Sequence, residues 1–146
     1  MQHALPQTPA VAMTDTPEGL GAIADPACAA AIWTRAPLPS FQAWLDPLPE
    51  NHLPKARLIT RTAWARSALL NVITTCGEAD CPHCAMLADD CAALATMFAD
   101  IMEAPFVRLR LDVVTTNACR KFHIDAVTAR LVCTYRGTGT QYGHAE

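Results

Sequence analysis

The sequence predicts an α+β fold in which an irregular N-terminal arm and several helices precede antiparallel strands. Nine of the 11 prolines lie within the first 54 residues, where no hydrophobic period is visible. Helical periodicity then dominates residues 62–102, and strict alternation begins only at residue 107. Because helical and strand patterns follow one another instead of alternating, an all-parallel sheet is not favoured.

The chain length and the composition predict two regions. Residues 1–29 are rich in Pro, Ala, Thr and Gly, and are interpreted as an irregular or flexible arm. Residues 30–146 then form a single α+β domain, since 146 residues suit one domain and hardly two.

The sequence of the first half of the domain predicts short helices and strands. Residues 30–33 are apolar and could form an edge strand, and residues 41–45 form a short helix with Ser40 as its N-cap. Pro47 stops this helix. Residues 53–60 could be a strand or an extended connector.

Two longer helices follow. Residues 62–75 place apolar side chains on one broad face, namely Trp64, Ala68, Leu69, Val72 and Ile73. Residues 86–102 show the stronger signal, with an apolar stripe at spacings of 3 and 4 formed by Leu87, Cys91, Leu94, Phe98 and Ile101. Pro105 ends this helix.

The last third of the chain has the period of β-strands. From residue 107 to 114, apolar residues alternate with Arg108, Arg110 and Asp112, which predicts a half-buried strand. A second strand is predicted over residues 127–136, with one face formed by Val127, Ala129, Leu131, Cys133 and Tyr135. The glycines of residues 137–140 close it with a loop.

The composition excludes several classes of function. Eleven basic and 14 acidic residues give a net charge of -3, which lacks the electrostatic footprint of a nucleic-acid-binding protein. Charged residues and prolines interrupt every apolar stretch before about 18 residues, so no membrane span is expected. No secretion signal is recognised at the N-terminus, and the seven cysteines are therefore expected to be reduced thiols or metal ligands in the cytoplasm.

The first chemical motif is His123-Ile124-Asp125. Side chains two positions apart on an extended segment point to the same side, so this imidazole and carboxylate could bind one metal ion. Such donors suit Fe(II), Mn(II) or Zn(II), and the facial triad of non-haem iron oxygenases has this composition. The alternative is a histidine and an aspartate that cap backbone groups in a loop.

The second motif is a cysteine cluster formed by Cys76, Cys81, His83 and Cys84. The spacing of Cys81 and Cys84 suits tetrahedral zinc, and Cys76 or His83 could add a third ligand. A second C-x2-C pair is absent from the sequence, so a loop with reduced thiols is the alternative. Catalysis by a serine nucleophile finds little support, because the chain lacks a G-x-S-x-G motif.

The segment from Val107 to Thr140 resembles the core of a bacterial family known as domain of unknown function 1826. The family pattern is N/D-A-C-x-x-F-H-x-D followed by R-L-x-x-T-Y-x-G-x-G-T. The matching residues are Asn117, Ala118, Cys119, Phe122, His123, Asp125, Arg130, Leu131, Thr134, Tyr135, Gly137, Gly139 and Thr140.

The resemblance implies a role connected with zinc or iron homeostasis, because genes of this family often lie beside zinc-homeostasis genes. It also implies a partial likeness to double-stranded β-helix oxygenases, with His123 and Asp125 as ligands of a divalent iron or zinc ion. Arg130 and Tyr135 would then be candidate pocket or catalytic residues, and 2-oxoglutarate a cosubstrate in full-length homologues.

The chain ends at Glu146, before the strands that would carry a distal histidine, so we expect a truncated domain and an incomplete three-ligand site. The exposed strand edges of such a domain could be covered by a second copy. The sequence therefore predicts a metal-binding protein with a small-molecule or metal ligand. A non-catalytic zinc-binding module at the cysteine cluster and a plain interaction domain are the alternatives.

Overall fold

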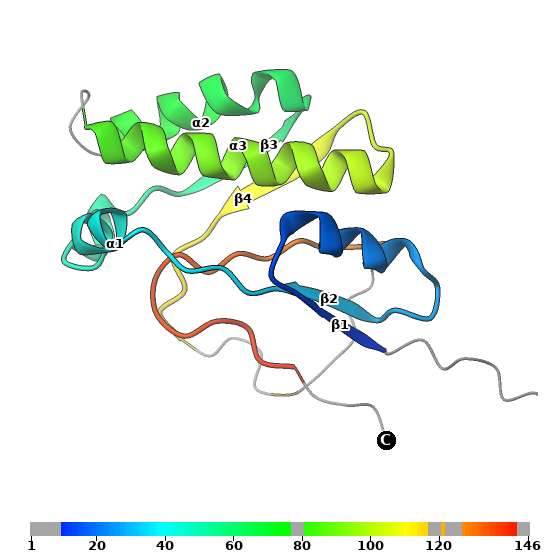
Figure 1. Cartoon of the computed structure of the whole chain (residues 1–146). Coiled ribbons are helices and arrows are strands. Elements are labelled where there is room, and N and C mark those ends of the chain that lie inside the picture. Colours follow the sequence, from blue (N-terminus) through cyan, green and yellow to red (C-terminus); the bar gives the residue numbers. More distant parts are fainter. Residues whose placement is uncertain (1–9, 77–80, 117–120, 122–126, 143–146) are drawn as a thin grey trace, which may run out of the picture. The chain divides into compact units, whose positions relative to one another are not determined.

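The computed structural model describes residues 10–76, 81–116, 121 and 127–142, and the chain falls into two units, Met1–Pro37 and Leu38–Glu146 (Figure 1). Helices and short sheets both occur, which confirms the α+β prediction. Among the described residues, no helix combines the length and the apolar character needed to cross a bilayer.

The first unit is built around two parallel strands. Strand β1 (Val11–Thr14) pairs with β2 (Ala30–Trp33), with Val11 opposite Ala30 and Thr14 opposite Trp33. The 3-10 helix η1 (Pro17–Ala24) lies in the connection between the strands, as a parallel pair requires a crossover. The region expected to be irregular therefore contains regular elements from residue 11 onward, whereas the strand expected at residues 30–33 is confirmed.

The second unit is a two-stranded antiparallel sheet with a helical hairpin on one face. Strand β3 (Ala56–Thr60) leads into α2 (Thr62–Cys76), α3 (Pro82–Met102) runs back, and β4 (Val107–Leu111) pairs with β3. Figure 1 shows α2 and α3 side by side above the two strands. The short helices α1 (Pro39–Leu45) and η2 (Glu50–His52) precede β3.

The core of the second unit lies among α1, α2 and α3. Its buried side chains are Phe41, Leu45, Leu69, Ile73, Cys84, Leu87, Ala88 and Cys91. The apolar stripe expected along the long helix is buried at its first three positions and half-buried at Phe98 and Ile101. Burial of such a stripe is what stabilises an amphipathic helix.

The helix ends follow local chemistry. Pro39 and Pro82 occupy the first turns of α1 and α3, where the missing N–H costs no hydrogen bond. Leu38 takes the N-cap position of α1 that the sequence assigned to Ser40, because the helix begins at Pro39, two residues earlier than expected. At the end of α3, Glu103 adopts a left-handed conformation with φ of 51°, and the N–H of Ala104 donates to the carbonyl of Ala99 at 2.9 Å.

The predicted strand over residues 127–136 is wrong as an assignment of secondary structure, since none of these residues lies in a strand. Its alternation is reproduced in the burial from residue 129 onward: Ala129, Leu131, Cys133 and Tyr135 are half-buried and the residues between them are exposed, whereas Val127, expected on the same face, is 52% exposed. One side of the segment is thus partly covered by the protein, but none of the described strands pairs with it. The double-stranded β-helix is likewise not confirmed, because the described strands form two separate two-stranded sheets.

Candidate functional site

The two residues of the H-x-D motif, His123 and Asp125, lie outside the described residues, as does Cys119. The flanks of the motif are described on both sides. Strand β4 ends at Leu111 before it, and the extended segment from 127 to 136, called here the motif tail, follows it. These two flanks therefore show how the motif is attached to the rest of the second unit.

The motif tail is fixed at Tyr135. The Tyr135 hydroxyl donates a hydrogen bond to Oδ2 of Asp90 at 2.5 Å and lies 3.3 Å from Sγ of Cys91. The Tyr135 ring meets the ring of Phe41 edge-on, with centroids 6.1 Å apart. Helix α3 thus provides the polar partners of the hydroxyl, and α1 provides an apolar partner for the ring.

The surroundings of Tyr135 raise the pKa of its hydroxyl group. Burial is the largest cause that raises the pKa of Tyr135, followed by the electrostatic influence of Cys91 and the hydrogen bond to Asp90. The phenol therefore stays protonated across the physiological range and acts as a hydrogen-bond donor. The contact with Asp90 anchors the motif tail to α3. Tyr135, one of the two candidate pocket residues, therefore holds the tail in place.

Two further hydrogen-bond donors attach the same tail to α1 and to the turn that follows it. The Gln42 amide donates to the carbonyl of Tyr135 at 2.9 Å and to Oδ1 of Asp46 at 2.5 Å. Nη1 of Arg136 donates to the carbonyl of Leu48 at 2.7 Å. A cation near the C-terminal end of a helix satisfies free carbonyls and complements the helix dipole.

Neither Gln42 nor Asp90 belongs to a sequence motif that indicates a site. Asp90 lies off the apolar stripe of α3, and Gln42 lies in a short helix, so neither position carries a periodic signal. Arg130, the other candidate pocket residue, is exposed on the outer side of the motif tail.

The described members of the cysteine cluster lie in different environments. Cys81 occupies the N-cap position of α3 without a capping hydrogen bond from its side chain and is half-buried, whereas Cys84 is 3% exposed and belongs to the core. The His83 ring stacks on Trp44 with centroids 5.4 Å apart and an angle of 12° between the planes. Adjacent helix positions point in different directions, so His83 and Cys84 diverge.

Cys76 lies at the end of α2, and its side chain is outside the description. Within the described part of the chain, no three His, Cys, Asp or Glu side chains come together in a way that could hold a metal ion. The zinc hypothesis for this cluster therefore stays a prediction, because one of its four members is not described.

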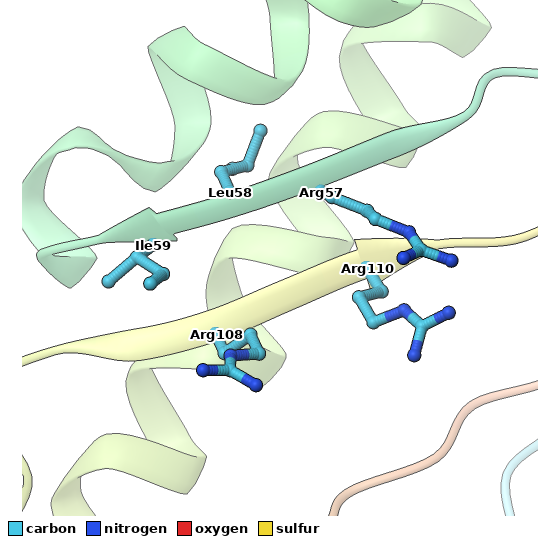
Figure 2. Close-up of a pocket in the computed structure, with 5 residues that line it drawn as sticks. All are labelled: Arg57, Leu58, Ile59, Arg108 and Arg110. Atoms are coloured by element: carbon cyan, nitrogen blue, oxygen red, sulfur yellow. The ribbon is translucent and has the colours of Figure 1, made fainter.

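A second surface feature lies on the face of the β3–β4 sheet that α2 and α3 leave open. A hollow of 310 Å³ there is lined by Arg57, Leu58, Ile59, Arg108 and Arg110. In Figure 2, Leu58 points away from the side on which the three arginines project. The sequence signal for this feature is the alternation of arginine with apolar residues in β4, which predicts a half-buried strand but not the register that brings Arg57 opposite Arg110.

No curated protein and no solved structure shows a significant match to this chain. Residues 14–146 match the profile of a family described as "Protein of unknown function (DUF1826)". The matched region includes the H-x-D motif, its described flanks and both units from the last residue of β1 onward. The chain therefore belongs to the DUF1826 family, as the resemblance of its C-terminal motif indicated.

Proposed function

We propose that the chain is a metal-binding protein whose H-x-D motif supplies His123 and Asp125 as ligands of a divalent iron or zinc ion. The chemistry of the donors supports this proposal. A neutral imidazole and a carboxylate are the pair that Fe(II) and Zn(II) accept, and their spacing of two residues lets both donors face one side of an extended segment.

The observation that carries the proposal is that described residues on both sides of the motif are fastened within the second unit. Upstream, Leu111 pairs with Ala56 at the end of β4. Downstream, Tyr135 and Arg136 are held by Asp90 and by the Leu48 carbonyl. A loop with fixed ends loses less conformational entropy when its ligands close on a metal than a free chain end would lose.

In this proposal, the metal would act as a Lewis acid or as a redox centre, according to its identity. The residues of this chain have two tasks: His123 and Asp125 bind the ion, and Tyr135 keeps the loop closed. The relation to zinc or iron homeostasis and an oxygenase-like use of the site belong to the proposal as well. The proposal assigns no third protein ligand.

Metal content tests the proposal directly. Untagged wild-type protein and the variants His123→Ala, Asp125→Ala and His52→Ala are purified alike, and iron and zinc are measured per chain. His52 is an exposed histidine of η2 and is the matched control. We expect the wild type and His52→Ala to retain metal and both motif variants to lose it. Equal metal in the wild type and in His123→Ala would overturn the assignment.

A further inference from the structure

The open face of the β3–β4 sheet concentrates arginine side chains. Arg57 lies directly opposite Arg110 in the antiparallel register, and Ile59 lies opposite Arg108. All four residues are exposed and are called here the arginine face (Figure 2). The opposite face of the same strands carries Ala56, Thr60 and Val107, which are buried.

This arrangement opposes the stability of the sheet. Like charges directly across an antiparallel pair repel each other, so the pairing of Arg57 with Arg110 is unfavourable for folding. Within the described parts of the chain, the only ion pair on this face joins Arg110 to Asp112 at 3.0 Å, and no described carboxylate pairs with Arg57 or Arg108. Among the described residues, Arg57 and Arg108 are therefore two arginines on one face to which no carboxylate is paired.

We propose that the arginine face binds an extended acidic segment of a partner protein. Guanidinium groups bind carboxylates through one or two hydrogen bonds, and Nη2 of Arg110 already lies 3.0 Å from Oδ2 of Asp112. Arg108 and Arg110 follow one another at alternate positions of a strand, about 7 Å apart along it. Alternate side chains of an extended peptide repeat at the same distance, so carboxylates at every second position match Arg108 and the N–H donors of Arg110 that lie away from the Asp112 contact.

An apolar contact favours a peptide over a nucleic acid. Ile59 is 68% exposed between the arginines and offers a branched aliphatic surface. Binding of single-stranded nucleic acid relies on aromatic platforms for base stacking, and no aromatic residue lines this hollow. The nearby Phe106 ring already has the Arg61 guanidinium over it, 4.7 Å from its centroid. The occupant is therefore expected to carry an apolar side chain beside its carboxylates.

The test uses a short fluorescein-labelled peptide with glutamate at every second position and one leucine, and a glutamine version of the same peptide. Fluorescence anisotropy with the full chain should give a Kd at least about tenfold lower for the glutamate peptide, as expected for a few charge pairs at an interface. Added salt should weaken this binding.

Two charge reversals locate the binding. Arg57→Glu and Arg108→Glu are each expected to weaken binding about tenfold. Arg57→Glu also places an acid opposite Arg110, which favours strand pairing, so its melting temperature should not fall. Arg66→Glu is the matched control, because Arg66 lies on α2, where it pairs with Asp89 of α3.

Several outcomes would overturn the inference. These are equal binding of the glutamate and glutamine peptides, undiminished binding by Arg57→Glu, or an equal loss in Arg66→Glu. Tighter binding of oligothymidylate than of the glutamate peptide would assign the face to nucleic acid instead. All of these readouts are independent of metal content, so the inference and the proposed metal site can fail separately.

Discussion

The Tyr135 hydroxyl donates to the Asp90 carboxylate at 2.5 Å and so joins the end of the family motif to the middle of helix α3. The two residues are 45 positions apart in the chain. Cys91, the neighbour of Asp90 in the helix, contributes a sulfur 3.3 Å from the same hydroxyl. The contact makes the position of the motif tail depend on a hydrogen bond to a charged group, and this dependence can be measured.

Removal of the hydroxyl should destabilise the protein. Tyr135→Phe keeps the ring against Phe41 but deletes the donor to Asp90. Hydrogen bonds to charged groups contribute about 1.5–3 kcal/mol, so we expect the free energy of unfolding to fall by roughly that amount. Urea unfolding followed by circular dichroism measures the change. Tyr142→Phe is the control, because Tyr142 is exposed; equal effects of the two variants would contradict the role of the anchor.

Stability should also fall in alkaline solution because of this residue. Burial, Cys91 and the hydrogen bond to Asp90 raise the pKa of Tyr135, so the folded state keeps a proton that the unfolded chain loses. This stabilisation is fully present below about pH 10, the ordinary pKa of tyrosine, and is lost as the pH rises further. The loss approaches about 1.4 kcal/mol per pH unit.

The unfolding free energies of the wild type and of Tyr135→Phe, measured from about pH 8 to about pH 11, test this linkage. The difference between the two proteins should shrink above about pH 10, since the variant has no phenol to retain. If the two profiles stay parallel, the phenol titrates alike in both states and the cause assigned to its pKa is incorrect.

Side-chain periodicity predicted the faces of the motif tail but not its pairing. Alternate burial from Ala129 to Tyr135 agrees with the sequence pattern. A strand, however, needs a neighbour in hydrogen-bonding register, and the sequence of one segment does not encode where its partner lies. Here side chains of Gln42 and Asp90 hold the segment, and both come from helices far away in the chain.

The faces of the helices were predicted more closely. Leu69 and Ile73 are buried in α2 as expected, but Trp64 is 62% exposed. Ala65, one position further on, is buried instead. A broad apolar face on a helix predicts the buried side only to within about one residue. Packing against α3 decides which residues at the edge of that face are buried. The arginine face could not be predicted from local periodicity. The pairing of Arg57 with Arg110 depends on the register between two strands that are separated in the chain by both long helices.

The cysteines at the start of α3 should react at different rates. Cys84 is 3% exposed in the core, whereas Cys81 is half-buried at the N-cap. We expect a maleimide to modify Cys81 well before Cys84 in the folded protein. Mass spectrometry measures the labelling of Cys81 in the variant Cys84→Ser and of Cys84 in the variant Cys81→Ser. Labelling in urea is the control and should remove the difference. Equal rates without urea would contradict the buried position of Cys84.

Zinc added before labelling extends the same experiment to the cysteine-cluster hypothesis. A metal ligand is a thiolate whose sulfur is occupied, so a zinc site would protect Cys81 and Cys84 together and a chelator would restore labelling. Protection that persists in His83→Ala would remove His83 from the set of ligands, which is the outcome that its stacking on Trp44 favours.

The first unit offers a matched pair of glycines. A Cβ atom at Gly19 would lie 2.0 Å from Oγ1 of Thr14 and 2.3 Å from its Cβ, whereas one at Gly21 meets nothing within 4 Å. Thr14 cannot yield easily, because its hydroxyl accepts from the N–H of Thr16 at 3.1 Å and its carbonyl accepts from the N–H of Thr34 at 2.9 Å. Gly19→Ala should therefore destabilise the β1–β2 pair by about 1–3 kcal/mol, the usual cost of overpacking. Faster amide hydrogen exchange in β1 measures this loss, and Gly21→Ala should leave the exchange unchanged; the same protection in both variants would contradict the close approach of η1 to β1.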